Sequence, residues 1–180
     1  MCCTARTAAH EAHRVPAEEE GMSSMGGIRY YEDVEIGEEF RSRTRTITET
    51  DVVTFASLSD DWSEVHISEE FAKGTAYGRR IAHGLLGLAI TEGLKLRGGA
   101  DQFAGIASLG WTWDFRKPVF LGDTIHVRCR LRDKRLTKDP GRGIFFLALE
   151  LVNQRGEVVH EGEHRLMVET RKVAKSAYAG

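Results

Sequence analysis

The segment His83-Gly84-Leu85-Leu86-Gly87-Leu88-Ala89-Ile90-Thr91-Glu92-Gly93-Leu94-Lys95-Leu96 decides the fold of this 180-residue chain. Leu86, Ile90 and Leu94 stand four residues apart, which predicts a long helix with a broad apolar face. Only Glu92 and Lys95 are charged, so we expect the helix to be buried on most of its sides. The glycine pair at 98 and 99 ends it.

Four strand candidates follow this helix, and turns rich in Gly, Pro and Asp separate them. They are Ile106–Phe115, Asp123–Leu131, Gly143–Asn153 and Val158–Glu169. The Gln154–Gly156 turn joins the last two as an antiparallel hairpin. Before the long helix, Arg41–Thr48 predicts one more strand, and Thr50 is a plausible N-cap for a short helix that ends near Leu58. This order predicts an α+β fold in which a curved antiparallel sheet wraps a long apolar helix.

The composition fits one soluble globular domain and excludes several classes of protein. The 25 Lys and Arg against 27 Asp and Glu give a net charge of −2, so no basic field invites nucleic acid or anionic lipid. The chain lacks a run of about 18 apolar residues, so we expect no membrane span. The three cysteines, Cys2, Cys3 and Cys129, do not form a disulfide framework. These features favour a cytoplasmic location.

The two ends of the chain differ in composition from its middle. Residues 1–26 contain an acidic Glu18–Glu20 run and no periodic apolar pattern, so we expect a disordered tail. They also lack the continuous apolar stretch of a secretory signal. We therefore expect the folded domain to occupy residues 27–172 and residues 173–180 to be frayed.

An acid and a histidine stand five residues apart in the polar stretch Asp61-Trp62-Ser63-Glu64-Val65-His66. We expect a loop here, followed by a short helical turn over Glu69–Ala76, and loops often carry catalytic residues. Asp and His can together take a proton from water and return one to carbon, as the addition of water to a double bond requires. Their ordinary pKa values, about 3.9 and about 6.5, suit these roles after modest shifts. Taken alone, the spacing is more typical of a solvated surface pair.

Two further segments contain groups that could bind an acyl thioester. Gly84 begins the long helix, where free N–H groups and the positive end of the helix dipole can hold a developing oxyanion. A glycine chosen for packing is the simpler explanation of that residue by itself. Arg116 and Lys117 offer cations to phosphates, or they are solvated charges at a turn. No His/Cys cluster has metal-ligand spacing, so we expect no metal. The other histidines suit structural or solvated positions: His10, His13, His126, His160 and His164.

Taken together and in this order, the segments resemble the MaoC-like hydratase/dehydratase family, which includes the (R)-specific enoyl-CoA hydratases. The matching stretches are Tyr31–Phe40, Asp61–His66 with Glu69–Ala72, Ile81–Leu85 and Phe115–Asp123, and they cover essentially residues 28–170. The resemblance implies a hotdog fold, in which a long central helix is wrapped by the sheet. It also implies that two subunits join their sheets edge to edge and hold acyl-CoA in a tunnel at the interface.

The resemblance also implies roles for individual residues. The family's catalytic aspartate falls on Asp61 and its catalytic histidine on His66. The glycine whose amide polarises the thioester carbonyl falls on Gly84. The substrate-binding positions that we expect beside them are Ser63, His83, Arg116 and Lys117.

The chain departs from the family pattern at two places. Ser63-Glu64 stands where the family usually has Asn-Pro, and the loss of proline loosens the loop. Ser63 can partly replace the lost amide, whereas Glu64, if it points inward, favours a protonated His66. Glu92 stands where the family's central helix has a small hydroxyl residue, so no role is carried over to it.

The resemblance implies a lyase of fatty acid metabolism that reversibly hydrates a trans-2-enoyl-CoA to an (R)-3-hydroxyacyl-CoA, with Asp61 and His66 activating one water. Such an enzyme needs no cofactor besides its CoA thioester substrate, and we expect a homodimer or a dimer of dimers. Two alternatives stay open: an acyl-CoA thioesterase on the same fold, and a non-catalytic hotdog protein that binds acyl thioesters. Four side chains are candidates for closing the tunnel and so setting the acyl length: Leu85, Leu86, Trp111 and Trp113.

Overall fold

The computed structural model describes residues 27–98 and 102–171. The tail expected over residues 1–26, which contains Cys2 and Cys3, and the frayed end expected over 173–180 lie outside the described residues. The third cysteine, Cys129, is buried and free, and burial raises the pKa of its thiol to about 12. Within the described ranges, no helix is both long and apolar enough to cross a membrane.

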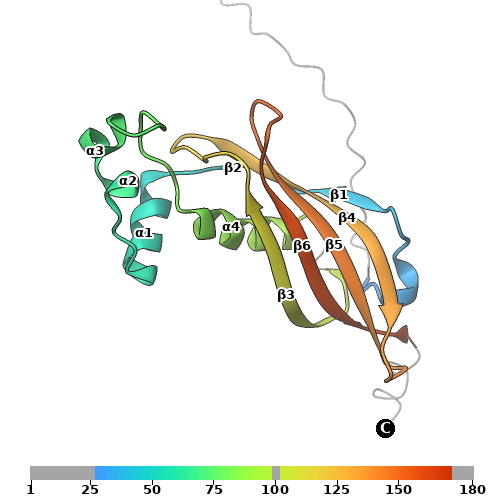
Figure 1. The fold of residues 1–180 in the computed structure, drawn as a ribbon. Coiled ribbons are helices and arrows are strands. Elements are labelled where there is room, and N and C mark those ends of the chain that lie inside the picture. The colour runs from blue at the N-terminus through green and yellow to red at the C-terminus, as the bar shows by residue number, and fades with distance from the viewer. Residues whose placement is uncertain (1–26, 99–101, 172–180) are drawn as a thin grey trace, which may run out of the picture.

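One antiparallel sheet forms the body of the molecule (Figure 1). Its spatial order is β1 (Glu39–Arg41), β4 (Thr124–Leu136), β5 (Arg142–Asn153), β6 (Val158–Glu169) and β3 (Gly105–Phe115), and the short β2 (Arg45–Thr46) pairs with β4. The four long strands confirm the expected ones, although β4 ends at Leu136 instead of Leu131.

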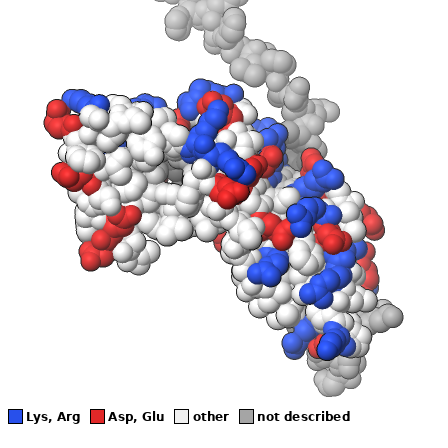
Figure 2. All heavy atoms as spheres, in the orientation of Figure 1, with Lys and Arg blue, Asp and Glu red and all other residues white. Residues whose placement is uncertain are grey.

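The alternation of side chains along β4 explains which face of the sheet packs on the helix. Val127, Cys129 and Leu131 are buried, whereas Arg128 and Arg130 between them are exposed. The exposed face is covered by ion pairs between neighbouring strands, of which Arg128 with Glu150 on β5 is one, at 2.7 Å. Figure 2 shows basic and acidic side chains interspersed over the sheet. The charged side chains thus lie on the exposed face of the sheet, and the buried face that packs on the helix is apolar.

The long helix α4 (Gly84–Leu96) lies across that apolar face, as predicted (Figure 1). Leu86, Ile90 and Leu94 join the core of the sheet. Leu85 and Leu96 are 61% and 41% exposed, so the expectation that the helix is buried on most sides is wrong for the single chain. The long helix wrapped by a curved antiparallel sheet confirms the hotdog fold.

Three shorter helices stand together beyond the N-terminal end of α4 (Figure 1), and we call them the helical arm. They are α1 (Glu49–Ser59), α2 (Glu64–Ile67) and α3 (Glu69–Lys73). The N-cap of α1 is Thr48, so the prediction of Thr50 is wrong. Thr48 and Asp51 form a capping box: the Thr48 hydroxyl accepts from the Asp51 N–H, and the Asp51 carboxylate accepts from the Thr48 N–H at 2.8 Å.

The segment expected to be one strand, Arg41–Thr48, forms two short strands with a break at residues 42–44. At the break, the Ser42 hydroxyl accepts a hydrogen bond from the Val127 N–H of β4 at 2.8 Å, and the Ser42 N–H donates to the Val127 carbonyl at 2.9 Å. Because a side chain takes the place of a main-chain acceptor, the regular ladder is interrupted there. A preceding 3-10 turn, η1 (Tyr31–Asp33), lies against β5.

Candidate active site

A cavity of about 550 Å³ lies where the helical arm meets the first turn of α4. Its walls include six of the seven predicted site residues, namely Asp61, His66, His83, Gly84, Arg116 and Lys117. The seventh, Ser63, contacts Asp61 from outside these walls. A larger cavity, about 920 Å³, lies between α1 and α4 and is lined by none of the seven.

Asp61 enters the cavity immediately after α1. The C-cap of that helix, Asp60, has a left-handed φ of 60°, which turns the chain out of the helix. The Asp61 carboxylate accepts hydrogen bonds from the Ser63 hydroxyl at 2.5 Å and from the Ser63 N–H at 3.3 Å. These two hydrogen bonds are the largest causes that lower the pKa of Asp61. The carboxylate is therefore ionised at neutral pH.

His66 lies on the one-turn helix α2, so the prediction that this histidine stands in a loop is wrong. The turn forms because the Ser68 N–H donates to the Glu64 carbonyl at 2.8 Å. Glu64 itself is exposed. The His66 Nδ1 lies 2.8 Å from the Ile81 carbonyl, and since a carbonyl only accepts, Nδ1 donates.

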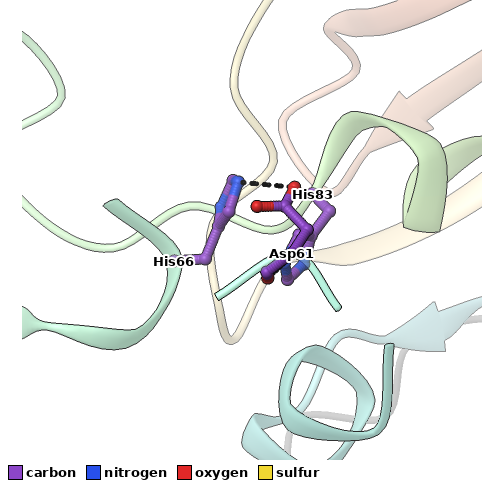
Figure 3. A group of neighbouring side chains, drawn as sticks. All are labelled: Asp61, His66 and His83. Carbon is purple, nitrogen blue, oxygen red and sulfur yellow. Dashed lines mark hydrogen bonds and ion pairs between the residues drawn. The ribbon is translucent and has the colours of Figure 1, made fainter. Parts of the chain in front are cut away.

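The other ring nitrogen of His66, Nε2, therefore presents a lone pair when the ring is neutral. It lies 4.0 Å from Asp61 Oδ2 (Figure 3), with the two side chains 12% and 45% exposed. Burial lowers the pKa of His66, and this effect outweighs the opposing hydrogen bond to Ile81. At neutral pH the pair thus consists of a neutral imidazole and an ionised carboxylate.

His83 holds the arm against α4. Its ring stacks on that of His66 with centroids 3.8 Å apart, and Phe55 of α1 packs on it with centroids 5.0 Å apart. The His83 Nε2 donates to the main-chain carbonyl of Asp61 at 2.9 Å, whereas its Nδ1 is buried with no hydrogen-bond partner among the described residues. The His66 ring is therefore fixed by the carbonyl of Ile81, which precedes α4. The His83 ring is fixed by the carbonyl of Asp61, which lies between α1 and α2.

Gly84 is the first residue of α4, where the N–H groups of the opening turn have no acceptor within the helix. A Cβ at this position would lie 2.7 Å from the ring of Phe115, so an alanine requires something to shift. The absence of a side chain therefore lets Phe115 pack against the first turn of α4, and Gly84 itself lines the cavity. Anionic oxygen is stabilised at such a helix end.

Arg116 and Lys117 lie at the rim of the cavity and are about half exposed. Both already have carboxylate partners: Arg116 contacts Glu161 at 2.7 Å and Asp114 at 3.0 Å, and Lys117 contacts Glu157 at 2.8 Å. Exposed pairs of this kind contribute little free energy, so a phosphate can replace the carboxylates at small cost.

Asp61, His66 and His83 place one donor atom each within 4.8 Å of the others, a cluster that their spacing in the sequence did not predict. Each imidazole also donates its other N–H to a carbonyl, as metal-bound histidines do. The planes of the two rings are tilted by 32° with centroids 3.8 Å apart. With three donor atoms this close together, the cluster can contact one small ligand, a water or a cation.

One residue of the cavity was missed by reasoning from the sequence. His160, which was expected to be structural or solvated, lines the cavity from β6 and is 3% exposed. Its only sequence signal is its place in a strand that faces the long helix. His126 and His164, which lie outside the cavity, are buried as well.

Comparisons with known proteins show which family this chain is similar to. The family model described as "MaoC like domain" matches residues 33–144. An (R)-specific enoyl-CoA hydratase of Rhodospirillum rubrum is 31% identical over 147 residues, 80% of this chain and 94% of that protein. A 3-hydroxybutyryl-CoA dehydratase of Methylorubrum extorquens is 34% identical over 109 residues, 59% of this chain and 66% of that protein. The crystal structure of a MaoC-like dehydratase from Rhodospirillum rubrum superposes with a TM-score of 0.72 at 28% identity, covering 79% of this chain and 98% of that one.

Proposed function

The chain belongs to the MaoC-like domain family, and we propose that it reversibly hydrates a trans-2-enoyl-CoA to an (R)-3-hydroxyacyl-CoA. The observation that carries this proposal is the separation of 4.0 Å between Asp61 Oδ2 and His66 Nε2 in a cavity that also contains the start of α4. The names of the relatives, a hydratase and a dehydratase, support a reaction of this class.

One water fits between the two catalytic side chains. A distance of 4.0 Å is too long for a direct hydrogen bond, but a water can lie within about 2.8 Å of both atoms. The water donates one hydrogen to the Asp61 carboxylate and the other to the lone pair of His66 Nε2. Its oxygen lone pair is then free to attack C3 of the enoyl group.

The protonation states determine where the protons go. Both catalytic groups begin without a transferable proton, so the proton that reaches C2 comes from the water. As the water oxygen bonds to C3, His66 Nε2 takes one of its protons and the C2–C3 π electrons move toward the thioester. The imidazolium, stabilised by the Asp61 carboxylate, then returns that proton to C2, and both residues recover their starting states.

The negative charge of the intermediate develops on the thioester oxygen. The N–H of Gly84 at the start of α4 is positioned to donate to this oxygen, and the helix dipole adds to the stabilisation. Loss of one donor of this kind in other enzymes costs about 10²–10³ in rate. Arg116 and Lys117 at the rim bind the phosphates of CoA by exchanging their carboxylate partners.

The test follows the absorbance of crotonyl-CoA with the full chain and four variants. We expect loss of the conjugated enoyl-thioester signal without release of free thiol. Asp61→Asn and His66→Ala each reduce kcat by about 10²–10⁴, because the water loses its acceptor. Asp60→Asn and His126→Ala are matched controls, an exposed neighbouring acid and a buried imidazole outside the cavity, and both keep activity within about threefold of the wild type.

Two other results would replace the proposal. Release of free CoA thiol would identify a thioesterase, in which water attacks the thioester carbonyl. Tight binding of crotonyl-CoA and of longer or branched enoyl-CoA esters, with no turnover of any of them, would identify a non-catalytic binding protein.

A further inference from the structure

His160 occupies the space beneath the first turns of α4. A Cβ on Gly87 would lie 2.5 Å from Cε1 of this ring and 2.7 Å from its Nδ1, so the imidazole fills the place of a side chain on the helix. Phe115 fills the corresponding place beneath Gly84, and the two rings contact each other with centroids 5.0 Å apart. His160 and Phe115 therefore form one continuous wall of the cavity that holds Asp61 and His66.

The ring of His160 is polar but its surroundings are not. Its neighbours on β3 are Phe115 and Trp113, both edge-to-face, and its Nδ1 is buried with no hydrogen-bond partner in the described part of the chain. Burial lowers the pKa of His160 to about 4, so the ring is neutral at pH 7. A neutral imidazole has one donor and one acceptor, and an aliphatic chain packed against this ring leaves them unsatisfied.

Further along the same interface, the space between α4 and the sheet is filled. Lys95, two turns beyond Gly87, is 1% exposed. Its Nζ lies 2.9 Å from Nδ1 of His164, which stands four residues after His160 on β6. The other nitrogen of His164 lies 2.9 Å from the Ser108 hydroxyl, and Trp111 stacks on its ring with centroids 4.1 Å apart. Since these groups are already paired and buried, polar side chains occupy the interface beyond His160.

We propose that His160 determines the acyl specificity of this site by ending the acyl pocket, so that the substrates are short-chain enoyl thioesters such as crotonyl-CoA. The inference rests on the function proposed above and narrows its substrate class. The imidazole opposes a longer alkyl chain in two ways: its volume blocks the space under Gly87, and contact of its buried, unpartnered Nδ1 with methylene groups is unfavourable. Of the tunnel-closing candidates, Trp113 contacts His160 edge-to-face, and Trp111 stacks on His164 with Lys95 over its ring.

The experiment compares crotonyl-CoA with trans-2-octenoyl-CoA as substrates of the full chain. We expect the wild type to favour crotonyl-CoA in kcat/KM by at least 100-fold. His160→Val, a smaller apolar side chain that suits a strand, raises the octenoyl-to-crotonyl ratio at least tenfold. His126→Val, a matched change at a buried imidazole of β4 outside the cavity, leaves the ratio unchanged. If His160→Val does not fold, as judged by circular dichroism, His160→Ala is used with the same expectation.

A wild type that hydrates octenoyl-CoA as well as crotonyl-CoA, or a folded His160→Val variant with an unchanged ratio, would overturn this inference while leaving the proposed function intact. If the wild type hydrates neither ester, the proposed function fails, and the pocket is tested by calorimetric binding of butyryl-CoA and octanoyl-CoA. His160→Val is then expected to tighten octanoyl-CoA at least tenfold relative to butyryl-CoA, and an unchanged Kd ratio would contradict the role of His160.

Discussion

The neighbours of Asp61 and His66 set the states in which these two residues meet a ligand. The Ser63 hydroxyl donates to the Asp61 carboxylate and favours its ionised form. On the other side, the Ile81 carbonyl holds a proton on Nδ1 of His66, so that Nε2 is free to accept. Two ordinary hydrogen bonds thereby decide which atoms of the pair are basic.

The rate should accordingly depend on pH through His66. Protonated Nε2 cannot accept a proton from water, so kcat/KM for crotonyl-CoA falls as the pH drops through the pKa of His66. Because burial lowers this pKa, the midpoint of the acid limb is expected below 6.5. A pH series from 4.5 to 8 measures it, and a midpoint at or above 6.5 would contradict the buried, neutral imidazole.

The sequence predicts which residues belong to the site better than it predicts which side chains the fold places beside them. Asp61, His66 and Gly84 could be proposed because they belong to short ordered motifs, and all three line one cavity. His160 could not, because its place in the cavity depends on the pairing of β6 with β3 and on the glycine at position 87 of α4. The cluster of Asp61, His66 and His83 likewise depends on how the arm meets α4.

The elements that carry these residues are positioned by local hydrogen bonds. The capping box of Thr48 and Asp51 begins α1, and the left-handed Asp60 ends it, so these two sites set where Asp61 leaves the helix. Thr50 also precedes an apolar run, which made it a plausible cap. Only Thr48 has an acid three residues later that can return the hydrogen bond.

We therefore expect Thr48→Ala to lower the free energy of unfolding by about 1 kcal/mol. Thr50→Ala is the matched control and should change it by less than about 0.5 kcal/mol, since its side chain lies within the helix instead of capping it. Urea denaturation followed by circular dichroism measures both. Equal effects of the two substitutions would contradict the assignment of the cap.

Regular elements were predictable where the hydrophobic period is long. The spacing of Leu86, Ile90 and Leu94 predicts α4, and alternation predicts the four long strands. The short elements were not predictable in this way. The break at Ser42 depends on a side-chain bond to β4, and α2 is a single turn closed by Ser68.

The fold buries several histidine side chains in their neutral form. The free energy of unfolding should therefore fall as the pH is lowered. Burial lowers the pKa of His160 to about 4 and that of His164 to about 3, against about 6.5 in an unfolded chain. Between those values the unfolded chain binds more protons than the folded one. Stability is therefore fully present above pH 6.5 and is lost as the pH falls toward 4.

The free energy of unfolding, measured with urea at pH 7 and pH 5, should fall by about 2 kcal/mol for each such histidine at the lower pH. His160→Val removes one of these groups and should reduce the difference by about that amount. Equal stability of the wild type at both pH values would show that these imidazoles are not held neutral by the fold.

The two edge strands of the sheet, β1 and β3, differ in length and therefore in how well each could pair with a second chain. β1 has three residues, whereas β3 has eleven, most of them exposed, with apolar Ile106 and Leu109 among them. A long exposed edge is a template for pairing with a second chain. We expect sedimentation equilibrium to give twice the 20.1 kDa chain mass.

A charged residue on this edge should oppose the pairing. Leu109→Lys is expected to raise the dimer dissociation constant at least tenfold, whereas Leu136→Lys, at an exposed position near the end of β4, should leave it unchanged. A wild-type mass of a single chain at micromolar concentration would contradict assembly through β3.

The paired imidazoles between the arm and α4 have a consequence for how the site can fail. His66 reaches from the arm to the carbonyl of Ile81, and His83 reaches back from α4 to the carbonyl of Asp61. If the arm moves outward, His66 loses the acceptor that keeps its proton on Nδ1, and the proton can migrate to Nε2. The water would then face an N–H instead of a lone pair. The hydrogen bond to Ile81 therefore fixes both the position of the His66 ring and the basicity of its Nε2.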